Sequence, residues 1–290
     1  MRISVANSTL SGHFGDEEAI RILAQIGYEA IDFRITERES ADIRSDYVSH
    51  CTGLKRIADD CGIAIGQFHA VAPSYVNDNP EKTKMMFGAV THCIEAAGIM
   101  GAPYVVVHPP IPRDYRYHDH RLECKEISME FFNKLIPYAK AAGVKIAIEN
   151  MWNYDYVRGR ICPTVCSEAA ELADYIDTLG TDVFGACLDL GHSLLTYEHP
   201  HEAIRFLGDR LLTVHIQDVD GVNDLHTVPY LGICDWKECA KAFKDIGFKG
   251  DLNMEIGGFL GAFPDELTVE AHKFAFLVIK HFRDSLINQR

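Results

Sequence analysis

A regular alternation of β-rich runs and helical stretches extends through the 290 residues of the sequence. Eight runs have the Val, Ile and aromatic content of strands, and they lie at residues 3–8, 29–35, 63–70, 104–109, 145–150, 183–190, 211–218 and 251–256. Such a repeat requires parallel strands joined by crossover helices, and a closed eight-stranded barrel uses every element. An open doubly wound sheet is the alternative, but no G-x-G-x-x-G follows the first run. We therefore predict an α/β protein with a single (β/α)8 TIM barrel over residues 1–290.

The links between these elements differ in length according to their direction. Links from a helix to the next strand are short, and several contain a glycine, which ends a helix at little cost in the left-handed conformation. These glycines are Gly27, Gly62, Gly143 and Gly247. Links from a strand to the next helix are long, at residues 36–49, 71–80, 110–120, 151–166, 219–234 and 257–266. In a barrel the long links share the face at the carboxyl ends of the strands, where active sites lie.

The composition excludes several classes of partner. The chain has 42 acidic and 28 basic residues and a net charge of −14, whereas proteins that bind nucleic acid present a basic face. Nine cysteines without a C-x-x-C pair argue for a reducing compartment. The start MRISVANSTL has no signal-peptide pattern, and no apolar run reaches the roughly 20 residues of a membrane helix. We expect a cytoplasmic protein without a membrane partner, and the sequence leaves a homo-oligomer open.

Metal-ligand residue types stand at the ends of the last four predicted strands. They are Glu149 in IAIEN, Asp189 in CLDLGH, His215 in VHIQD and Glu255 in NMEI. Because strand side chains alternate, the residues two positions earlier share their face, and these are Ala147, Cys187, Thr213 and Asn253, all small or medium. Three carboxylates converging with an imidazole would repel one another without a cation. The pattern therefore predicts a divalent metal with oxygen-rich ligands.

Further polar residues surround this set in the sequence. His69 and His108 end the third and fourth predicted strands, and His192 and the pair Asp224 and His226 follow the sixth and seventh. Each has an ordinary alternative, as a satisfied polar group or a solvated turn residue. Ligand types at equivalent places on four successive strands favour a metal site over these alternatives.

At these residues the chain resembles the xylose isomerase-like TIM-barrel superfamily, in particular sugar isomerases and epimerases of the tagatose-3-epimerase and inosose-isomerase kind. The segments that carry the resemblance are FHA, VVVHPP, IAIENMWN, CLDLGH, VHIQD, HTVPYLGICDW and NMEI, and they span nearly the whole chain. The resemblance implies one divalent metal, commonly manganese, held by Glu149, Asp189, His215 and Glu255. It also implies that the two glutamates act as the acid/base pair and that His192 contacts the substrate.

The same superfamily includes endonuclease IV, which holds three zinc ions. Its ligand pattern maps onto His69, His108, Glu149, Asp189, His192, His215, Asp224, His226 and Glu255, and every one of these positions carries a ligand-type residue. The resemblance thus leaves the number of metals open and favours manganese or zinc over cobalt or magnesium. The excess of acidic residues argues against the nuclease.

The function predicted first is a metal-dependent isomerase or epimerase of a ketose, an inosose or a sugar phosphate. Glu149 and Glu255 would move a proton from one face of the substrate to the other through a metal-stabilised enediolate. The predicted substrate contacts are His69, His108, His192, His226, Trp152 and Phe68. The alternatives are a zinc-dependent abasic-site nuclease, a keto-polyol dehydratase that begins with the same proton abstraction, and a non-catalytic sensor.

Overall fold

The computed structural model of the protein describes residues 1–35, 47–76, 79–111 and 120–288. The predicted links 36–49 and 110–120 fall mostly outside the described residues, and so do two positions of the link 71–80.

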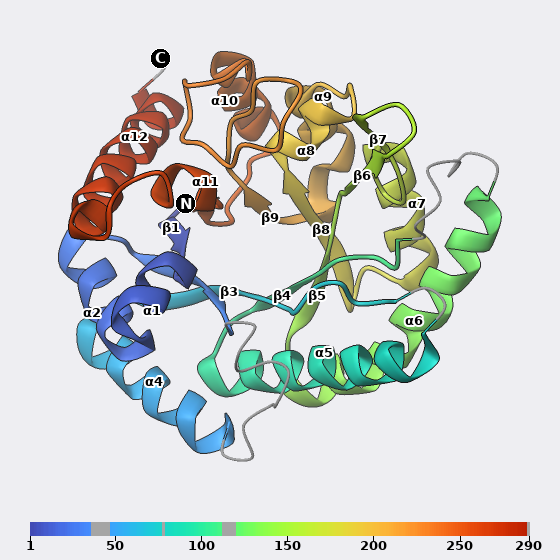
Figure 1. Ribbon diagram of the computed structural model, residues 1–290, viewed down its shortest axis with the longest axis horizontal. Helices are drawn as coiled ribbons and strands as arrows, with labels where there is room; N and C mark the ends of the chain where they lie inside the picture. Colours follow the sequence, from blue (N-terminus) through green and yellow to red (C-terminus); the bar gives the residue numbers. More distant parts are fainter. Residues whose placement is uncertain (36–46, 77–78, 112–119, 289–290) are drawn as a thin grey trace.

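Eight parallel strands form the central sheet (Figure 1). They are β1 (Ile3–Ala6), β2 (Ala30–Arg34), β3 (Ala64–His69), β4 (Tyr104–Val107), β5 (Lys145–Glu149), β8 (Phe184–Asp189), β9 (Leu211–His215) and β10 (Leu252–Met254). Each strand pairs with its neighbour in sequence, and β10 pairs with β1. The ring closes where Ile216 meets Met254 in a parallel bridge, with the Ile216 amide donating to the Asn253 carbonyl at 2.7 Å. The predicted (β/α)8 barrel is confirmed.

Helices surround the barrel on its outside (Figure 1). The longer ones are α2 (Asp16–Ile26), α4 (Tyr47–Cys61), α5 (Pro80–Met100), α6 (Arg121–Ala142), α7 (Ala169–Leu179), α9 (Pro200–Leu207), α10 (Trp236–Asp245) and α12 (Thr268–Asn288). Short helical segments lie between them, at α1 (Ser8–Phe14), α8 (Leu190–Leu195), η2 (Gly208–Arg210), α11 (Gly257–Leu260) and η3 (Asp265–Leu267). The last helix, α12, packs against both α10 and α2 and so completes the ring. Within the described ranges, no helix combines the length and the apolar character needed to cross a membrane.

The link after β5 contains structure that the sequence did not reveal. Residues 151–166 were expected to be a loop, but they include an antiparallel hairpin of β6 (Trp152–Asp155) and β7 (Arg160–Pro163). The carboxylate of Asp155 accepts the amides of Val157 and Arg158 at 2.9 and 3.0 Å, which shapes the turn. Two strands of four residues give too little alternation to be recognised in a sequence. The hairpin begins at Trp152, beside the carboxyl end of the barrel.

The interior of the barrel below the strand ends is packed with small and medium side chains. Val106, Ala147 and Cys187 form a buried cluster there, and Leu212 packs against it. Leu212 is the extra residue at a register shift between β8 and β9, where Ala186 pairs with Leu211 but Cys187 pairs with Thr213. Its neighbour Gly185 leaves the space that Leu212 fills, because a Cβ at Gly185 would lie 2.4 Å from Leu212 Cγ.

We predict that Gly185→Val destabilises the barrel by about 1–3 kcal/mol, the usual cost of overpacking a core. The added side chain would meet Leu212 and also the Arg210 carbonyl, 2.9 Å from the Cβ position, and backbone cannot move aside easily. The measurement is the free energy of unfolding in urea. Gly88→Ala in α5 is the matched control, because its Cβ meets nothing within 4 Å and a helical Ala adds about 0.5–1 kcal/mol of stability. Equal unfolding midpoints for Gly185→Val and wild type would contradict the packing described.

Candidate active site

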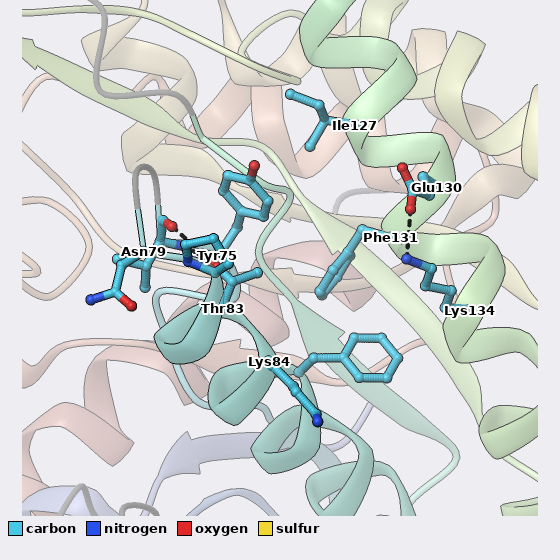
Figure 2. Close-up of a pocket in the computed structure, with 11 residues that line it drawn as sticks. Tyr75, Asn79, Thr83, Lys84, Ile127, Glu130, Phe131 and Lys134 are labelled. Carbon is cyan, nitrogen blue, oxygen red and sulfur yellow. Dashed lines mark hydrogen bonds and ion pairs between the residues drawn. The ribbon is translucent and has the colours of Figure 1, made fainter.

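Cavities in the size range of small-molecule sites, about 300–1,000 Å³, include two in the described part of the molecule. One, of about 430 Å³, lies on the outside of the barrel between α5 and α6 (Figure 2) and contains none of the predicted site residues. The other, of about 370 Å³, lies at the carboxyl ends of the strands. Its lining consists of Arg34, Ile35, His69, Ala70, Val71, Ala72, His108, Glu149, Met151, Trp152, His192, Asp224, His226 and Glu255. Most of the predicted site residues therefore share one cavity. Two of the predicted metal ligands, Asp189 and His215, lie buried outside its lining, and so does Phe68.

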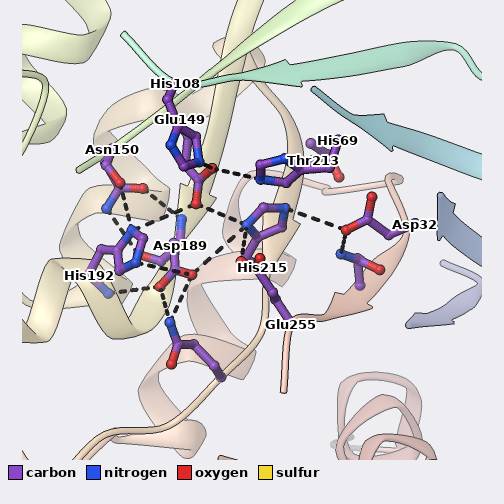
Figure 3. Close-up of polar contacts among 12 residues, drawn as sticks. Asp32, His69, His108, Glu149, Asn150, Asp189, His192, Thr213, His215 and Glu255 are labelled. Atoms are coloured by element: carbon purple, nitrogen blue, oxygen red, sulfur yellow. Dashed lines mark hydrogen bonds and ion pairs between the residues drawn. The ribbon is translucent and has the colours of Figure 1, made fainter. Parts of the chain in front are cut away.

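The four predicted metal ligands meet at one atom, Nδ1 of His215 (Figure 3). It lies 3.0 Å from Glu149 Oε1, 2.8 Å from Glu255 Oε2 and 3.9 Å from Asp189 Oδ2. Three of these residues end β5, β8 and β9, and Glu255 directly follows β10. All four residues are buried. The structure thus brings the predicted set together.

Burial and neighbouring charges compete at these carboxylates. Burial raises the pKa of Asp189 above its ordinary value, despite the opposing charge of His192. At Glu149 burial acts in the same direction, but His215 and His108 overcome it and hold the pKa well below the ordinary value. Glu255 behaves like Glu149, with His215 and Arg34 as the lowering groups. A cluster of buried carboxylates is stable only with compensating positive charge, which imidazoles, a guanidinium or a cation can supply.

Side chains from across the barrel orient the His215 ring. The side-chain amide of Gln67 lies 2.9 Å from His215 Nε2, and the Thr213 hydroxyl donates to the other end of the same amide. With the Gln67 N–H donating to Nε2, the Nδ1 atom faces Glu149 and Glu255. Asp32 lies 3.9 Å beyond Nε2 and accepts from the Asn253 amide at 3.2 Å.

Three other histidines share a common hydrogen-bonding arrangement. In each, Nδ1 donates to a backbone carbonyl: His69 to Ala70 at 2.8 Å, His192 to Asn150 at 2.9 Å and His226 to Glu255 at 2.9 Å. Nε2 is then the ring nitrogen that each of these histidines presents to the cavity. A backbone acceptor on one nitrogen is the usual way in which a metal-binding histidine is oriented.

The Nε2 atoms fall into two groups around carboxylates. Glu149 Oε2 lies 3.4 Å from His69 Nε2 and 3.0 Å from His108 Nε2. Asp224 Oδ2 lies 3.4 Å from His192 Nε2 and 3.0 Å from His226 Nε2. The second group, His192, Asp224 and His226, has the composition and spacing of a possible cation site. His69 and Glu149 instead belong to one set with His215 and Glu255.

The loop that carries Asp224 and His226 is anchored by Asp218, which is buried. The Asp218 carboxylate accepts the amides of Tyr230 and Cys234, each at 3.1 Å, and the indole N–H of Trp236 at 2.8 Å. One carboxylate thus holds both ends of the loop against the start of α10. Asp224 and His226 consequently have defined positions, in contrast to the solvated turn that was the alternative for this segment.

Asp189 has a structural role besides its place in the cluster. Its Oδ1 accepts the His192 amide at 2.7 Å and so caps the N-terminus of α8. The Asn150 side chain accepts the Asp189 amide at 2.6 Å and donates to its carbonyl at 3.0 Å. The Gln217 amide lies 3.0 Å from Asp189 Oδ2 and 3.1 Å from Asp224 Oδ1, which links the two carboxylates.

Several of these residues were missed in the sequence, although alternation along the strands could have indicated them. Gln67 is two residues before His69, Asp32 two before Arg34, and Gln217 two after His215, so each shares an inward face with a site residue. The missed residues are Asp32, Arg34, Gln67, Asn150 and Gln217.

Trp152 and Phe68 were both predicted to contact the substrate, and the structure places only Trp152 in the cavity. Trp152 lines the cavity, and its indole N–H donates to Asp224 Oδ2 at 3.0 Å. Phe68 is fully buried and packs against Phe33 with ring centroids 5.5 Å apart, in the main hydrophobic core. Because it neighbours His69 on the same strand, its side chain points to the opposite face of the sheet. Phe68 therefore does not form a wall of the site.

We predict that the metal-free protein loses stability as the pH rises from about 6.5, the ordinary pKa of histidine, toward 10. Burial alone would lower the pKa of His192, but Asp189 and Asp224 raise it to about 10, and Asp224 similarly raises the pKa of His226 to about 9. A raised pKa means that the ion pairing stabilises the fold fully below the unfolded pKa and is lost as pH passes the folded one. Thermal unfolding of chelator-treated protein between pH 6 and 10 measures this. Asp224→Asn should flatten the pH dependence, and an unchanged slope in that variant would refute the pairing.

Comparison with known proteins places the chain in a family. A family model described as a xylose isomerase-like TIM barrel matches residues 20–275. The D-psicose 3-epimerase of Enterocloster bolteae is 26% identical over 243 residues, which cover 80% of this chain and 77% of that protein. The uncharacterized protein y4fM of Sinorhizobium fredii is 28% identical over 168 residues, 56% of this chain. The chain spans 50% of the length of y4fM and 61% of that of the uncharacterized protein MJ1311 of Methanocaldococcus jannaschii.

Solved structures agree with this fold over almost the whole chain. A D-tagatose 3-epimerase-like protein superposes with a TM-score of 0.73 at 18% identity, covering 99% of this chain and 100% of that one. D-psicose 3-epimerase from Clostridium cellulolyticum H10, solved with D-tagatose, gives 0.73 at 17% identity and covers 99% of both chains. L-ribulose 3-epimerase gives 0.72 at 18% identity, covering 100% of this chain and 98% of that one. The chain belongs to the xylose isomerase-like TIM-barrel family, as its strand-end motifs predicted.

Proposed function

We propose that this protein is a metal-dependent isomerase or epimerase that acts on a ketose, an inosose or a sugar phosphate. The observation that carries the proposal is the placement of Glu149 and Glu255 on either side of His215 Nδ1, at 3.0 and 2.8 Å. Both glutamates line the cavity, so both can reach a molecule held in it. The kinship with D-psicose 3-epimerase and the structural likeness to other 3-epimerases support the same class of reaction.

The donor chemistry of the site supports the metal part of the proposal. Glu149, Asp189, His215 and Glu255 would hold one divalent cation. Three carboxylates and an imidazole suit manganese and are acceptable to zinc, with cobalt and magnesium as alternatives. Two buried atoms that face this site, Glu149 Oε2 and His69 Nε2, have ion-pair contacts but no partner in hydrogen-bond geometry among the described residues, which fits a site that takes up a further group. A cation there would polarise a substrate carbonyl and make the neighbouring C–H more acidic.

The chain's own residues would carry the proton. His215 and its neighbours keep the pKa of both glutamates below the ordinary value, so both are ionised and able to accept a proton. One ionised glutamate would remove the proton from one face of the substrate. The other would take up a proton from water and return it to the opposite face, and the first would then release its proton to water. His108, which is 20% exposed in the cavity, would hydrogen-bond a substrate oxygen. Trp152 would cover one side of the sugar while holding Asp224 in place.

A second candidate is a three-zinc nuclease for abasic DNA. It is favoured by the convergence of all nine predicted zinc ligands on adjoining groups. It is opposed by the net charge of −14, which disfavours a polyanion. If the protein is a sugar isomerase or epimerase, His69, His108 and Asp224 would instead bind substrate hydroxyls or a further cation. Metal analysis of the purified protein and an abasic-DNA cleavage assay distinguish the nuclease from the sugar isomerase or epimerase. Three zinc ions per chain together with DNA cleavage would exclude the sugar reaction.

We predict that Glu149→Gln and Glu255→Gln each lower turnover by about 10²–10⁴-fold, the contribution of a general base. Glutamine keeps the size of the side chain but cannot accept the proton. The assay incubates a panel of ketoses and inososes with enzyme in D₂O, and it measures both product and deuterium at the reacting carbon. A product whose mass is lower than that of the substrate by one water would identify a dehydratase. The control is Glu130→Gln on the exposed face of α6. Turnover that survives in Glu255→Gln with metal bound would exclude the two-base mechanism.

Asp189→Asn separates metal binding from helix capping. Asparagine caps a helix as well as aspartate does, so α8 should keep its hydrogen bond to the His192 amide. The variant lacks the negative charge, and we expect its affinity for Mn²⁺ to fall by more than the roughly 10–100-fold typical of residues that only orient a ligand. Thermal unfolding with and without Mn²⁺ measures both properties, since bound metal raises the midpoint. A variant stabilised by Mn²⁺ as strongly as wild type would remove Asp189 from the ligand set.

A further inference from the structure

Arg34 is a permanent cation in the wall of the cavity, and its pairing with Glu255 engages only part of its guanidinium. It ends β2, lines the cavity and donates from its guanidinium to Glu255 Oε1. The side chain is 32% exposed, so part of it faces the open cavity. Its Nε–H is buried and has no partner within the described residues. A guanidinium has five N–H donors in a rigid plane, and among the described residues only Glu255 accepts from the guanidinium of Arg34.

The backbone of Arg34 is held by the side chain of Asn7, which directly follows β1. Asn7 Oδ1 accepts the Arg34 amide at 2.7 Å, and Asn7 Nδ2 donates to the Arg34 carbonyl at 3.3 Å. Asn7 is itself fixed, because its Nδ2 also lies 2.8 Å from Ser11 Oγ in α1. The guanidinium therefore projects from a defined position at the rim of the barrel.

The surroundings of Arg34 suit an anion. Ile35, Val71 and Ala72 form the adjacent lining, and an apolar lining strengthens an ion pair by lowering the local dielectric constant. Glu255 engages one edge of the guanidinium, and in the proposed function its other oxygen, Oε2, belongs to the metal cluster. The remaining donors match the paired oxygens of a carboxylate or a phosphate, which arginine binds through two parallel hydrogen bonds. A neutral sugar would leave these donors without a charged partner.

We propose that Arg34 determines the substrate class, by binding an anionic group of the sugar, a carboxylate or a phosphate. This inference rests on the proposed isomerase or epimerase function. It excludes a purely structural role in which Arg34 only pairs with Glu255.

The test compares neutral and anionic sugars on the metal-loaded enzyme. The substrates are D-fructose, D-fructuronate and D-fructose 6-phosphate, and the variants are Arg34→Met, which removes the charge, and Arg34→Lys, which keeps the charge but loses the planar fork. We expect wild type to prefer one of the anionic sugars. Arg34→Met should raise the KM for that sugar by about 10–100-fold, the value of one charge-assisted contact, and alter the KM of fructose less than about threefold. Arg34→Lys should fall between wild type and Arg34→Met.

A binding measurement keeps this result separate from the proposed function. Calorimetry with D-galacturonate, D-galactose and D-glucose 6-phosphate reports binding even if no sugar is turned over. Binding of an anionic sugar to wild type but not to Arg34→Met would support the inference in the absence of turnover, and the two anions distinguish carboxylate from phosphate. The inference would be overturned if neither D-galacturonate nor D-glucose 6-phosphate bound to the wild type. So would an equal fall of kcat for neutral and anionic sugars in Arg34→Met with KM unchanged, because that result describes a residue that positions Glu255.

Discussion

The closure of the barrel between β9 and β10 is the contact on which the site depends. The seam consists of the bridge between Ile216 and Met254, with the Glu255 amide donating to the Ile216 carbonyl at 3.3 Å. This pairing places His215 at the end of one strand next to Glu255 beyond the end of the other. Without the seam, β9 and β10 would be free edges of the sheet. The carboxylates of β5 and β8 would then have no imidazole between them and Glu255. The fold and the candidate active site are thus products of the same hydrogen bonds.

Electrostatics explains why so much of the upper barrel is polar. Glu149, Asp189 and Glu255 are buried at distances that bring their charges into conflict, and such a cluster is costly unless cations offset it. His108, His215 and Arg34 supply part of the compensation. A divalent cation would supply the rest, in the manner proposed for the sugar reaction. Gln67 contributes no charge, but it directs Nδ1 of His215 toward the carboxylates through its amide contact at 2.9 Å.

The layer below this cluster shows the opposite chemistry. Ala147, Cys187 and Gly185 leave room beneath the site, and Leu212 fills it from a register shift in β9. Small residues under large polar ones allow the glutamates and His215 to approach one another without steric conflict. The rigid, apolar layer also limits movement of the strand ends, so that the polar groups are held at fixed separations. The stability of the lower barrel and the geometry of its upper rim are therefore coupled.

The alternation of strands and helices was sufficient to predict the barrel, because period-two and period-3.6 patterns reflect burial that any eight-unit barrel requires. The strand-end residues Glu149, Asp189, His215 and Glu255 were also predictable, since parallel strands bring equivalent positions to one rim. Tertiary structure decided which of the other polar residues take part. Gln67 and Arg34 carry no signal apart from strand alternation, and Phe68, next to His69, was assigned to the wrong face. Contacts such as Arg34 with Glu255 join residues far apart in the chain, and only the closed ring brings them within hydrogen-bonding distance.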